Sequence, residues 1–180
     1  MKLETHRLLI RPISLDDKND VFEYRSDSKT NKYQGWIPQT IDEVEEFIGK
    51  ISTQIDVPGT WFQFVIIEKE TEKIIGDLGI HFLDGDNKQA EFGCTLSKHS
   101  QHKGYAMEAL VRVIDYLFKE LNKHRIIASI DPGNIKSIHL VERIGFRKEA
   151  HFVESLWING TWVDDVIYAL IEKDWEKRNG

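Results

Sequence analysis

A short turn with one glycine, Gln101-His102-Lys103-Gly104-Tyr105-Ala106, has the composition of an anion-binding site. A long amphipathic segment follows it, so its backbone N–H groups are expected at a helix N-terminus, where the helix dipole favours negative charge. Gly104 has no Cβ, which lets the oxygens of a ligand approach the backbone closely. The turn therefore predicts a phosphorylated ligand.

Two familiar phosphate-binding motifs do not account for this turn. The P-loop needs a longer glycine loop that ends in Gly-Lys-Ser/Thr, and the sequence contains no such segment. The dinucleotide-binding fingerprint needs three spaced glycines, whereas the turn contains only Gly104. Taken alone, the segment leaves an ordinary strand-to-helix turn open as the alternative.

The flanking segments predict the elements that position the turn. Apolar side chains alternate over residues 90–96, which is the period of a half-buried strand. From Ala106 to Leu121 apolar residues recur every three or four positions, as on one face of a helix. A strand, an anion-binding turn and a helix are therefore expected in succession.

Strands and helices are also expected along the rest of the chain. The strands are predicted at residues 3–11, 61–68, 74–82, 90–96, 125–130, 153–158 and 163–170. Capping patterns at 14–17 and 40–43 open two helices, and Asn134 caps another helix that ends at Gly145. Asn159-Gly160 suits a type I′ hairpin turn. The order β-α-α-β-β-β-α-β-α-β-β predicts an α/β (α+β) fold, with helices flanking a mixed sheet.

Length, charge and cysteine content narrow the class of protein. A chain of 180 residues is expected to form a single domain, residues 1–180. The net charge of −6 argues against general nucleic-acid binding, which needs a basic face. The one cysteine, Cys94, excludes an internal disulfide and favours the cytoplasm. The N-terminus lacks the apolar core of a signal peptide, and no run is long and apolar enough to span a membrane.

Two motifs in this order resemble the GNAT N-acetyltransferase superfamily. The first is the Gln-x-x-Gly-x-Ala turn after the fourth strand, and the second is Asn134-Ile135-Lys136-Ser137 with the later Gly145-Phe146. The start (residues 5–12) and the tail (residues 157–168) are similar to ribosomal-protein Ser/Ala N-terminal acetyltransferases. The resemblance covers essentially the whole chain, and it implies the GNAT fold with a mixed, mostly antiparallel sheet.

The resemblance assigns a donor, acetyl-CoA, to the turn. In the family, backbone amides of the turn bind the pyrophosphate, which here implies His102, Lys103, Gly104, Tyr105 and Ala106, with Gln101 shaping the turn. The backbone of Cys94, Thr95 and Leu96 is expected to pair with the pantetheine arm as an added strand does. Asn134 and Ser137 are expected to face the arm and the thioester. Candidates for binding the adenosine 3′-phosphate are Lys98, His99, Lys103, Lys136 and Arg143. The alternative for each is an ordinary solvated surface side chain that binds no ligand.

Acetyl transfer needs a neutral amine and a stabilised leaving thiolate. Glu91 is the expected general base, with a solvent-facing carboxylate as the alternative. Ser137 is the expected donor to the departing sulfur, with a hydroxyl that satisfies the helix backbone as the alternative. Some relatives use a tyrosine as the acid, but no tyrosine follows Ser137 closely, which leaves Tyr105 and Tyr168 as the open candidates. Cys94 is expected to be a core residue and not a nucleophile.

The acceptor site is less defined by the sequence. The expected acceptor-binding residues are Trp36, Phe82, Trp157 and Asp164. The alternative for the aromatic residues is a place in the core, and the alternative for Asp164 is an ordinary surface position. The pair His99 and His102 has no further ligands beside it, so no metal site is expected.

Together these features predict an acetyl-CoA-dependent N-acetyltransferase, an acyltransferase that acts on a primary amine. The resemblance favours a protein N-terminal α-amine, and a small-molecule amine (polyamine, amino acid or antibiotic) or a non-catalytic acetyl-CoA-binding module stays open. The expected partners are acetyl-CoA and the amine acceptor, without nucleic acid or membrane. A homodimer is left open beside a monomer.

Overall fold

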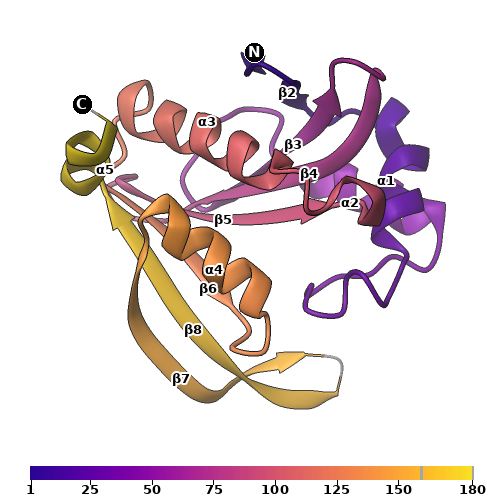
Figure 1. Ribbon diagram of the computed structural model, residues 1–180. Coiled ribbons are helices and arrows are strands. Elements are labelled where there is room, and N and C mark those ends of the chain that lie inside the picture. The colour runs from indigo at the N-terminus through magenta and orange to yellow at the C-terminus, as the bar shows by residue number, and fades with distance from the viewer. Residues whose placement is uncertain (159, 180) are drawn as a thin grey trace.

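The structure is a computed structural model that describes residues 1–158 and 160–179. Its strands form one eight-stranded sheet in the order β1-β2-β3-β4-β5-β6-β8-β7 (Figure 1). The strands are β1 (Leu3–Glu4), β2 (Leu8–Pro12), β3 (Thr60–Glu68), β4 (Lys73–Phe82), β5 (Gln89–Leu96), β6 (Arg125–Ile130), β7 (Arg147–Ile158) and β8 (Thr161–Ile171). The α-helices are α1 (Lys18–Arg25), α2 (Ile41–Lys50), α3 (Tyr105–Lys119), α4 (Ile135–Ile144) and α5 (Glu172–Asn179), and the short 3-10 helices are η1 (Leu15–Asp17) and η2 (Lys98–Ser100). The mixed, mostly antiparallel sheet expected from the sequence is confirmed.

The sheet is antiparallel except where β5 meets β6. These two strands run parallel and pair only over residues 89–91 and 125–127. β5 continues to Leu96 along β4, and β6 continues to Ile130 along β8. Because β5 and β6 are paired only at their first residues, the sheet opens between their C-terminal halves.

Helices cover both faces of the sheet and build two cores. The larger core joins one face to α3, α4 and α5, and it includes Leu78, Phe92 and Leu117. The smaller core joins the other face to α1 and α2 through Val21, Val44 and Val65 and their neighbours. In Figure 1 the sheet accordingly lies between α3 and α4 on one side and α1 and α2 on the other.

The helix ends follow the capping signals in the sequence. The Ser14 N–H donates to the Asp17 carboxylate at 2.7 Å, and Thr40 Oγ1 accepts from the Glu43 N–H at 3.3 Å. Asn134 Oδ1 accepts from the Ser137 N–H at 3.3 Å. Gly145 ends α4 with φ of 117°, a left-handed conformation that suits glycine. The predicted caps are confirmed at these positions.

Three elements differ from the sequence-based expectations. The first strand is broken, because β1 turns back and pairs with β2 in the register Leu3↔Ile10. β7 begins at Arg147 and not at the predicted Val153, and α5 follows β8 although no helix was predicted there. The first half of β7 is an exposed polar edge strand without a buried apolar face, and α5 has little amphipathic character. A single buried side chain, Trp175, fixes α5 against Phe118 of α3.

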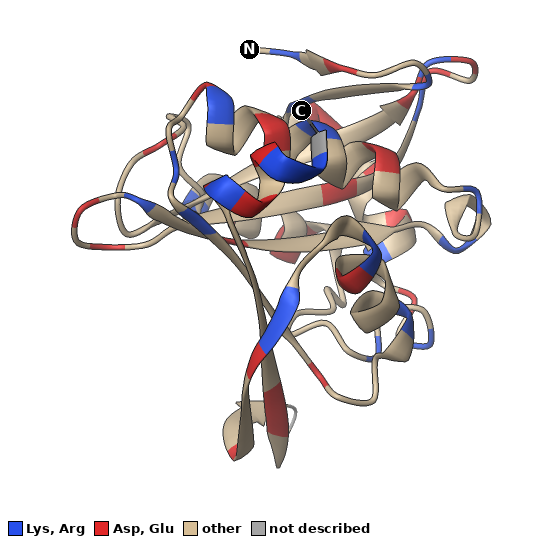
Figure 2. Ribbon diagram, turned by 60° about the vertical axis from the view of Figure 1, so that its left-hand side comes forward, with Lys and Arg blue, Asp and Glu red and all other residues tan. Residues whose placement is uncertain are grey.

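The β7–β8 hairpin extends beyond the rest of the sheet (Figure 2). Its strands pair as far as Ile158↔Thr161. The type I′ turn expected at Asn159-Gly160 lies outside the described residues, because Asn159 is not among them. Among the helices that the structure describes, none is long and apolar enough to cross a membrane.

Candidate active site

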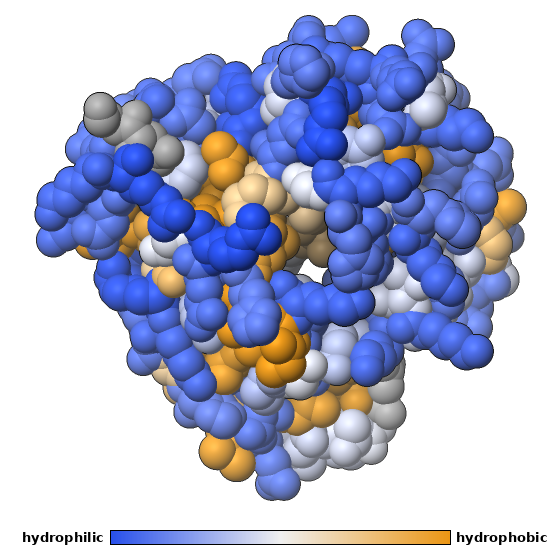
Figure 3. All heavy atoms as spheres, in the orientation of Figure 1, coloured by the Kyte–Doolittle hydropathy of each residue, from blue (hydrophilic) through white to orange (hydrophobic). Residues whose placement is uncertain are grey.

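The opening between β5 and β6 forms a large cleft. Its volume is about 1250 Å³, and its walls come from β5, β6, the N-terminal half of α3, most of α4, and residues 29–34 after α1. Figure 3 shows a hollow at the centre of this face of the molecule. The cleft is large enough for an extended ligand, and it lies where the sheet itself has unpaired strand edges.

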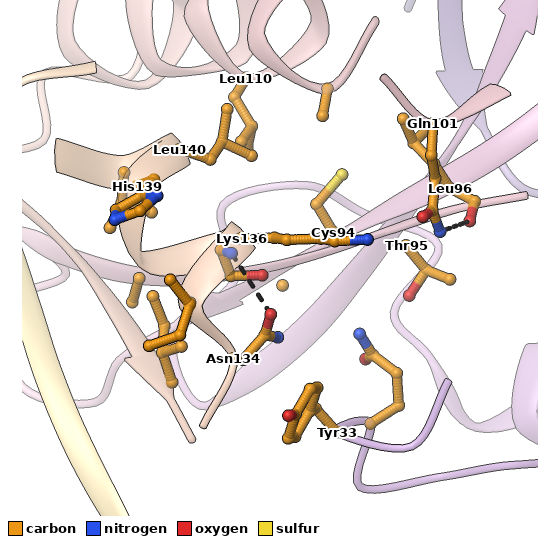
Figure 4. Close-up of a pocket in the computed structure, with 18 of the residues that line it drawn as sticks. Tyr33, Cys94, Thr95, Leu96, Gln101, Leu110, Asn134, Lys136, His139 and Leu140 are labelled. Atoms are coloured by element: carbon orange, nitrogen blue, oxygen red, sulfur yellow. Dashed lines mark hydrogen bonds between the residues drawn. The ribbon is translucent and has the colours of Figure 1, made fainter. Parts of the chain in front are cut away.

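The turn before α3 forms one end of the cleft. Gly104 has φ of 84° and His102 has φ of 63°, so the chain bends through two left-handed residues before the helix begins. The Gln101 side-chain amide donates to the Leu96 carbonyl at 3.2 Å and ties the turn to β5 (Figure 4). The first N–H groups of α3 have no partner within the helix, so they are available to an anion.

An ion pair between Arg7 and Glu108 holds this turn. Arg7 Nε donates to Glu108 at 2.7 Å, and the Arg7 backbone N–H donates to the same carboxylate at 2.9 Å. Arg7 Nη1 also donates to the Lys103 carbonyl at 3.0 Å. Sequence reasoning missed Glu108 because its partner lies 101 residues away.

Basic side chains predominate around the cleft. Lys29, Lys32, Lys98, Lys136 and Arg143 line it, together with His102 and His139. The lining acids among the described residues are Glu108, which Arg7 neutralises, and Asp131, which accepts from the Gly133 N–H at 2.7 Å. This balance favours a polyanion. Of the residues expected at the donor site, all line the cleft except His99 and Lys103.

The β5 residues that form one wall point their side chains to opposite faces. Cys94 and Leu96 pack toward α3 and α4, and Thr95 faces the other way. Burial raises the pKa of the Cys94 thiol to about 12, with a further contribution from the Asp77 carboxylate. The thiol is therefore neutral near pH 7 and unsuited to act as a nucleophile.

Asn134 and Ser137 lie at the start of α4 and line the opposite wall, and Figure 4 shows Asn134 there. Their mutual hydrogen bond runs from the Ser137 backbone N–H to the Asn134 side chain, which leaves the Ser137 hydroxyl uninvolved in the cap. A hydroxyl at a helix N-terminus is suited to donate to a developing negative charge.

Glu91 lies beside the cleft, at the last residue of β5 that pairs with β6. It does not line the cleft itself, although its neighbours Phe92 and Gly93 do. Its carboxylate is 3.8 Å from His81 Nδ1, and His81 stacks on Trp61. Desolvation raises the pKa of Glu91, which suits a carboxylate that accepts a proton.

Asp165 of β8 lies near Glu91 and was not anticipated from the sequence. It is buried, and its carboxylate accepts from Ser129 Oγ at 2.8 Å. Its negative charge adds to the desolvation that raises the Glu91 pKa. No sequence signal marks this acid, because β6 and β8 are far apart in the chain and become neighbours only in the folded sheet.

The two tyrosines that were open as general acids are hydrogen-bonded elsewhere. Tyr105 Oη donates to Glu68, and Tyr168 Oη donates to Glu142 at 3.0 Å. Burial and the hydrogen bond to Glu142 raise the pKa of Tyr168.

The four expected acceptor residues do not converge. Trp36 stacks on Phe47 in the smaller core, with ring centroids 4.5 Å apart. Phe82 is fully buried in the larger core, so the expectation that it binds the acceptor is wrong. Trp157 is 60% exposed on the hairpin and packs against Trp162. Asp164 is engaged within the hairpin by the Glu154 N–H and His151.

The described residues contain no cluster of three or more His, Cys, Asp or Glu side chains that could hold a metal ion.

The family model, the similar sequences and the similar structures all belong to acetyltransferases. The family model described as acetyltransferase (GNAT) domain matches residues 7–147. The N-acetyltransferase YnaD of Bacillus subtilis is 34% identical over 97% of this chain and 99% of its own length. The crystal structure of a GNAT-family acetyltransferase from Bacillus anthracis matches with a TM-score of 0.86 at 31% identity, over 96% of this chain and 99% of that one.

Two further similar proteins have names that state an acceptor. The ribosomal protein uS5-alanine N-acetyltransferase of Escherichia coli is 28% identical over 97% of this chain and 93% of its own length. A spermidine N-acetyltransferase from Vibrio cholerae, solved with CoA and spermine, matches with a TM-score of 0.82 at 25% identity, over 96% of this chain and 99% of that one.

Proposed function

This chain belongs to the GNAT acetyltransferase family, and on that premise we propose that it transfers acetyl from acetyl-CoA to the N-terminal α-amine of a protein or peptide. The family and the N-acetyltransferase activity agree with every relative described above. The proposal adds the acceptor and the residues that act on it.

The cleft supports a bound acetyl-CoA at three places. The N–H groups at the start of α3 suit the pyrophosphate, and the unpaired edges of β5 and β6 suit the amides of the pantetheine arm. The lysines and Arg143 around the rim suit the 3′-phosphate. In this arrangement acetyl-CoA supplies the activated acetyl group as a thioester.

The charge of the cleft is the observation that carries the choice of acceptor. Five Lys and Arg side chains line it, and its two acids are already engaged by other groups. A polyamine carries several positive charges and would need several free carboxylates, whereas a peptide N-terminus carries one. An α-amine also has a pKa of about 8, so a useful fraction is neutral near pH 7, unlike a lysine amine at about 10.4.

Glu91 and Ser137 are proposed for the two proton-handling roles. Glu91, at the end of the β5–β6 pairing, accepts the proton that the attacking amine loses, directly or through a water. The new C–N bond forms as the C–S bond breaks, and the Ser137 hydroxyl donates to the departing sulfur. Desolvation raises the Glu91 pKa, and the negative charge of Asp165 adds to this effect.

A polyamine acceptor is the second candidate, and one observation favours it. Glu91 and Asp165 are two acids whose charges interact, and negative charge beside the cleft suits an ammonium group. The Vibrio cholerae relative is named for spermidine. The two candidates differ in what they require: a polyamine needs both carboxylates free, whereas an α-amine needs only a base.

Ligand-dependent stability tests the donor. Acetyl-CoA at 100 times its dissociation constant is expected to add about 2.7 kcal/mol to the free energy of unfolding. The melting temperature should therefore rise with acetyl-CoA concentration. An unchanged melting temperature at saturating acetyl-CoA would contradict the donor site.

Turnover tests the acceptor and Ser137. Release of the CoA thiol is measured with N-terminal peptides that begin with Ser or Ala, with the same peptides blocked at the α-amine, and with spermidine. Unblocked peptides are expected to turn over, and Ser137→Ala is expected to lower kcat by about tenfold or more. Turnover of spermidine alone would select the second candidate, and wild-type turnover in Ser137→Ala would remove Ser137 from the mechanism.

A further inference from the structure

Arg7 lies in the short loop between β1 and β2, and its side chain reaches the turn before α3, 96 positions further along the chain. Its guanidinium contacts three consecutive residues of that turn. Nη1 donates to the Lys103 carbonyl at 3.0 Å, and Nη2 is 3.4 Å from the position that a Cβ on Gly104 would occupy. The guanidinium carbon is 4.4 Å from the centroid of the Tyr105 ring. Arg7 itself does not line the cleft, so it acts on a ligand there only through the turn.

The Arg7 guanidinium is held in place by groups on both sides of it. Nε and Nη2 both lie 2.7 Å from Glu108 Oε2. The Arg7 backbone N–H and the Thr5 hydroxyl donate to the other oxygen, Glu108 Oε1, at 2.9 and 2.5 Å. The Arg7 carbonyl accepts from the Lys69 N–H at 2.9 Å. The side chain is therefore fixed in its contact with the turn before a ligand binds, which is the structural meaning of preorganisation.

The hydrogen bond to the Lys103 carbonyl sets the direction of the next backbone N–H. A peptide unit is planar and trans, so its carbonyl and its N–H point in opposite directions, and no cis peptide bond occurs among the described residues. Since the Lys103 carbonyl points toward Arg7, the Gly104 N–H of the same unit points away from it. Gly104 lines the cleft whereas Arg7 and Lys103 do not, so this N–H is directed to the cleft. A hydrogen bond to the carbonyl also polarises the unit and strengthens its N–H as a donor.

We propose that Arg7 is a positioning residue for the acetyl donor: it fixes the Lys103–Gly104 peptide unit so that the Gly104 N–H is directed at the pyrophosphate of acetyl-CoA. This inference rests on the proposed function. The charge of Arg7 is neutralised by Glu108, so its contribution is one of geometry. A planar guanidinium can bind a carboxylate and a carbonyl in fixed directions at once, whereas the single ammonium of lysine cannot.

Three donors that differ in their phosphates test this role. Acetyl-CoA and acetyl-dephospho-CoA both contain the pyrophosphate, and only the first has the 3′-phosphate, whereas S-acetylpantetheine has neither. Arg7→Met is expected to raise the dissociation constants of the first two by about three- to tenfold, and that of S-acetylpantetheine by less than about twofold. NMR titration of the protein with each donor measures all three constants. At saturating acetyl-CoA, kcat should stay near that of the wild type.

Two further variants separate the geometry of Arg7 from its charge and from its effect on stability. Arg7→Lys keeps the charge and loses the fork, so it should weaken acetyl-CoA binding about as much as Arg7→Met. Arg11→Met removes a comparable ion pair, because Arg11 donates to both oxygens of Asp17 at 2.7 Å outside the cleft lining. It should lower the melting temperature while it leaves all three dissociation constants within about twofold of the wild type.

Three results would overturn the inference: wild-type affinity for acetyl-CoA in Arg7→Met, an equal loss of affinity for S-acetylpantetheine, or wild-type affinity in Arg7→Lys. The second result would mean a general distortion of the cleft, and the third would mean that the charge alone acts. If Arg7→Met does not fold, Arg7→Lys carries the same comparison of donors. Failure of the proposed function is recognised separately, because the wild-type protein would then bind none of the three donors.

Discussion

The Tyr33 hydroxyl donates a hydrogen bond of 2.8 Å to the carbonyl oxygen of Gly133. These residues lie 100 positions apart, one in the segment after α1 and the other in the turn between β6 and α4. Both line the cleft, so the bond joins its two rims. A ligand that lies beneath this bridge can leave more easily once the bridge is broken.

Tyr33→Phe removes the bridge and keeps the ring. We expect acetyl-CoA to dissociate about two- to tenfold faster, because one neutral hydrogen bond is lost. Stopped-flow displacement of the bound ligand measures this rate. Tyr116→Phe, at a buried position on α3 outside the cleft lining, is the matched control and should leave the rate unchanged. Equal rates in wild type and Tyr33→Phe would show that the bridge does not retain the ligand.

Gly104→Ala and Gly49→Ala should change stability in opposite directions. Gly104 has φ of 84°, where a Cβ costs roughly 1–2 kcal/mol, so Gly104→Ala should destabilise the protein and weaken acetyl-CoA binding. Gly49 lies in α2 with no atom within 4 Å of an added Cβ, so alanine there should stabilise by up to about 1 kcal/mol. Urea unfolding of both variants checks the two signs, and a stabilised Gly104→Ala would contradict the left-handed turn.

Glu91→Gln should change the pH dependence of kcat/KM. Because desolvation raises the Glu91 pKa, the carboxyl stays protonated to a higher pH than an ordinary glutamate, and the base is lost as pH falls through that pKa. The wild-type profile should therefore show an acidic limb from Glu91 and a second one from the α-amine near pH 8. Glu91→Gln should lower kcat/KM by about 10²–10⁴-fold and keep only the amine limb.

Glu142→Gln serves as the control for this profile, because Glu142 is an exposed acid outside the cleft lining. Its profile should match that of the wild type. If the pH profile of Glu91→Gln retained both acidic limbs, a group other than Glu91 would be the proton acceptor.

Arg25→Met should destabilise the protein strongly. Arg25 and Asp77 form a buried ion pair, and removal of one partner from such a pair typically costs about 3–5 kcal/mol. Lys50→Met breaks the exposed pair with Glu46 and should cost less than about 0.5 kcal/mol. Urea unfolding compares the two, and similar losses would contradict the buried character of the Arg25–Asp77 pair.

Much of the fold follows from local sequence signals. The alternation at residues 90–96 and the apolar stripe of α3 predict the strand and the helix on either side of Gly104. The caps at Thr40 and Asn134 fix two helix starts, because their side chains bond to backbone only three residues away. Such short-range patterns are readable because both partners lie in the same segment.

Segments without a strong local pattern were not predictable. The early part of β7 is polar and exposed, and the sheet pairing with β8 stabilises it. Phe82 was assigned to the acceptor although it is a core residue, because an aromatic residue at a strand end has the same local pattern in either place.

The sequence by itself predicted the family, which the comparisons confirm, and it singled out the turn and the residues that we propose for the donor site. Only the tertiary structure showed that Arg7 holds the turn through Glu108 and that the charge of Asp165 acts on Glu91. These relationships join strands and helices that are distant in sequence. They depend on the order of strands in the sheet and on the early divergence of β5 and β6, which arise from packing across the whole domain and leave no local pattern in the chain.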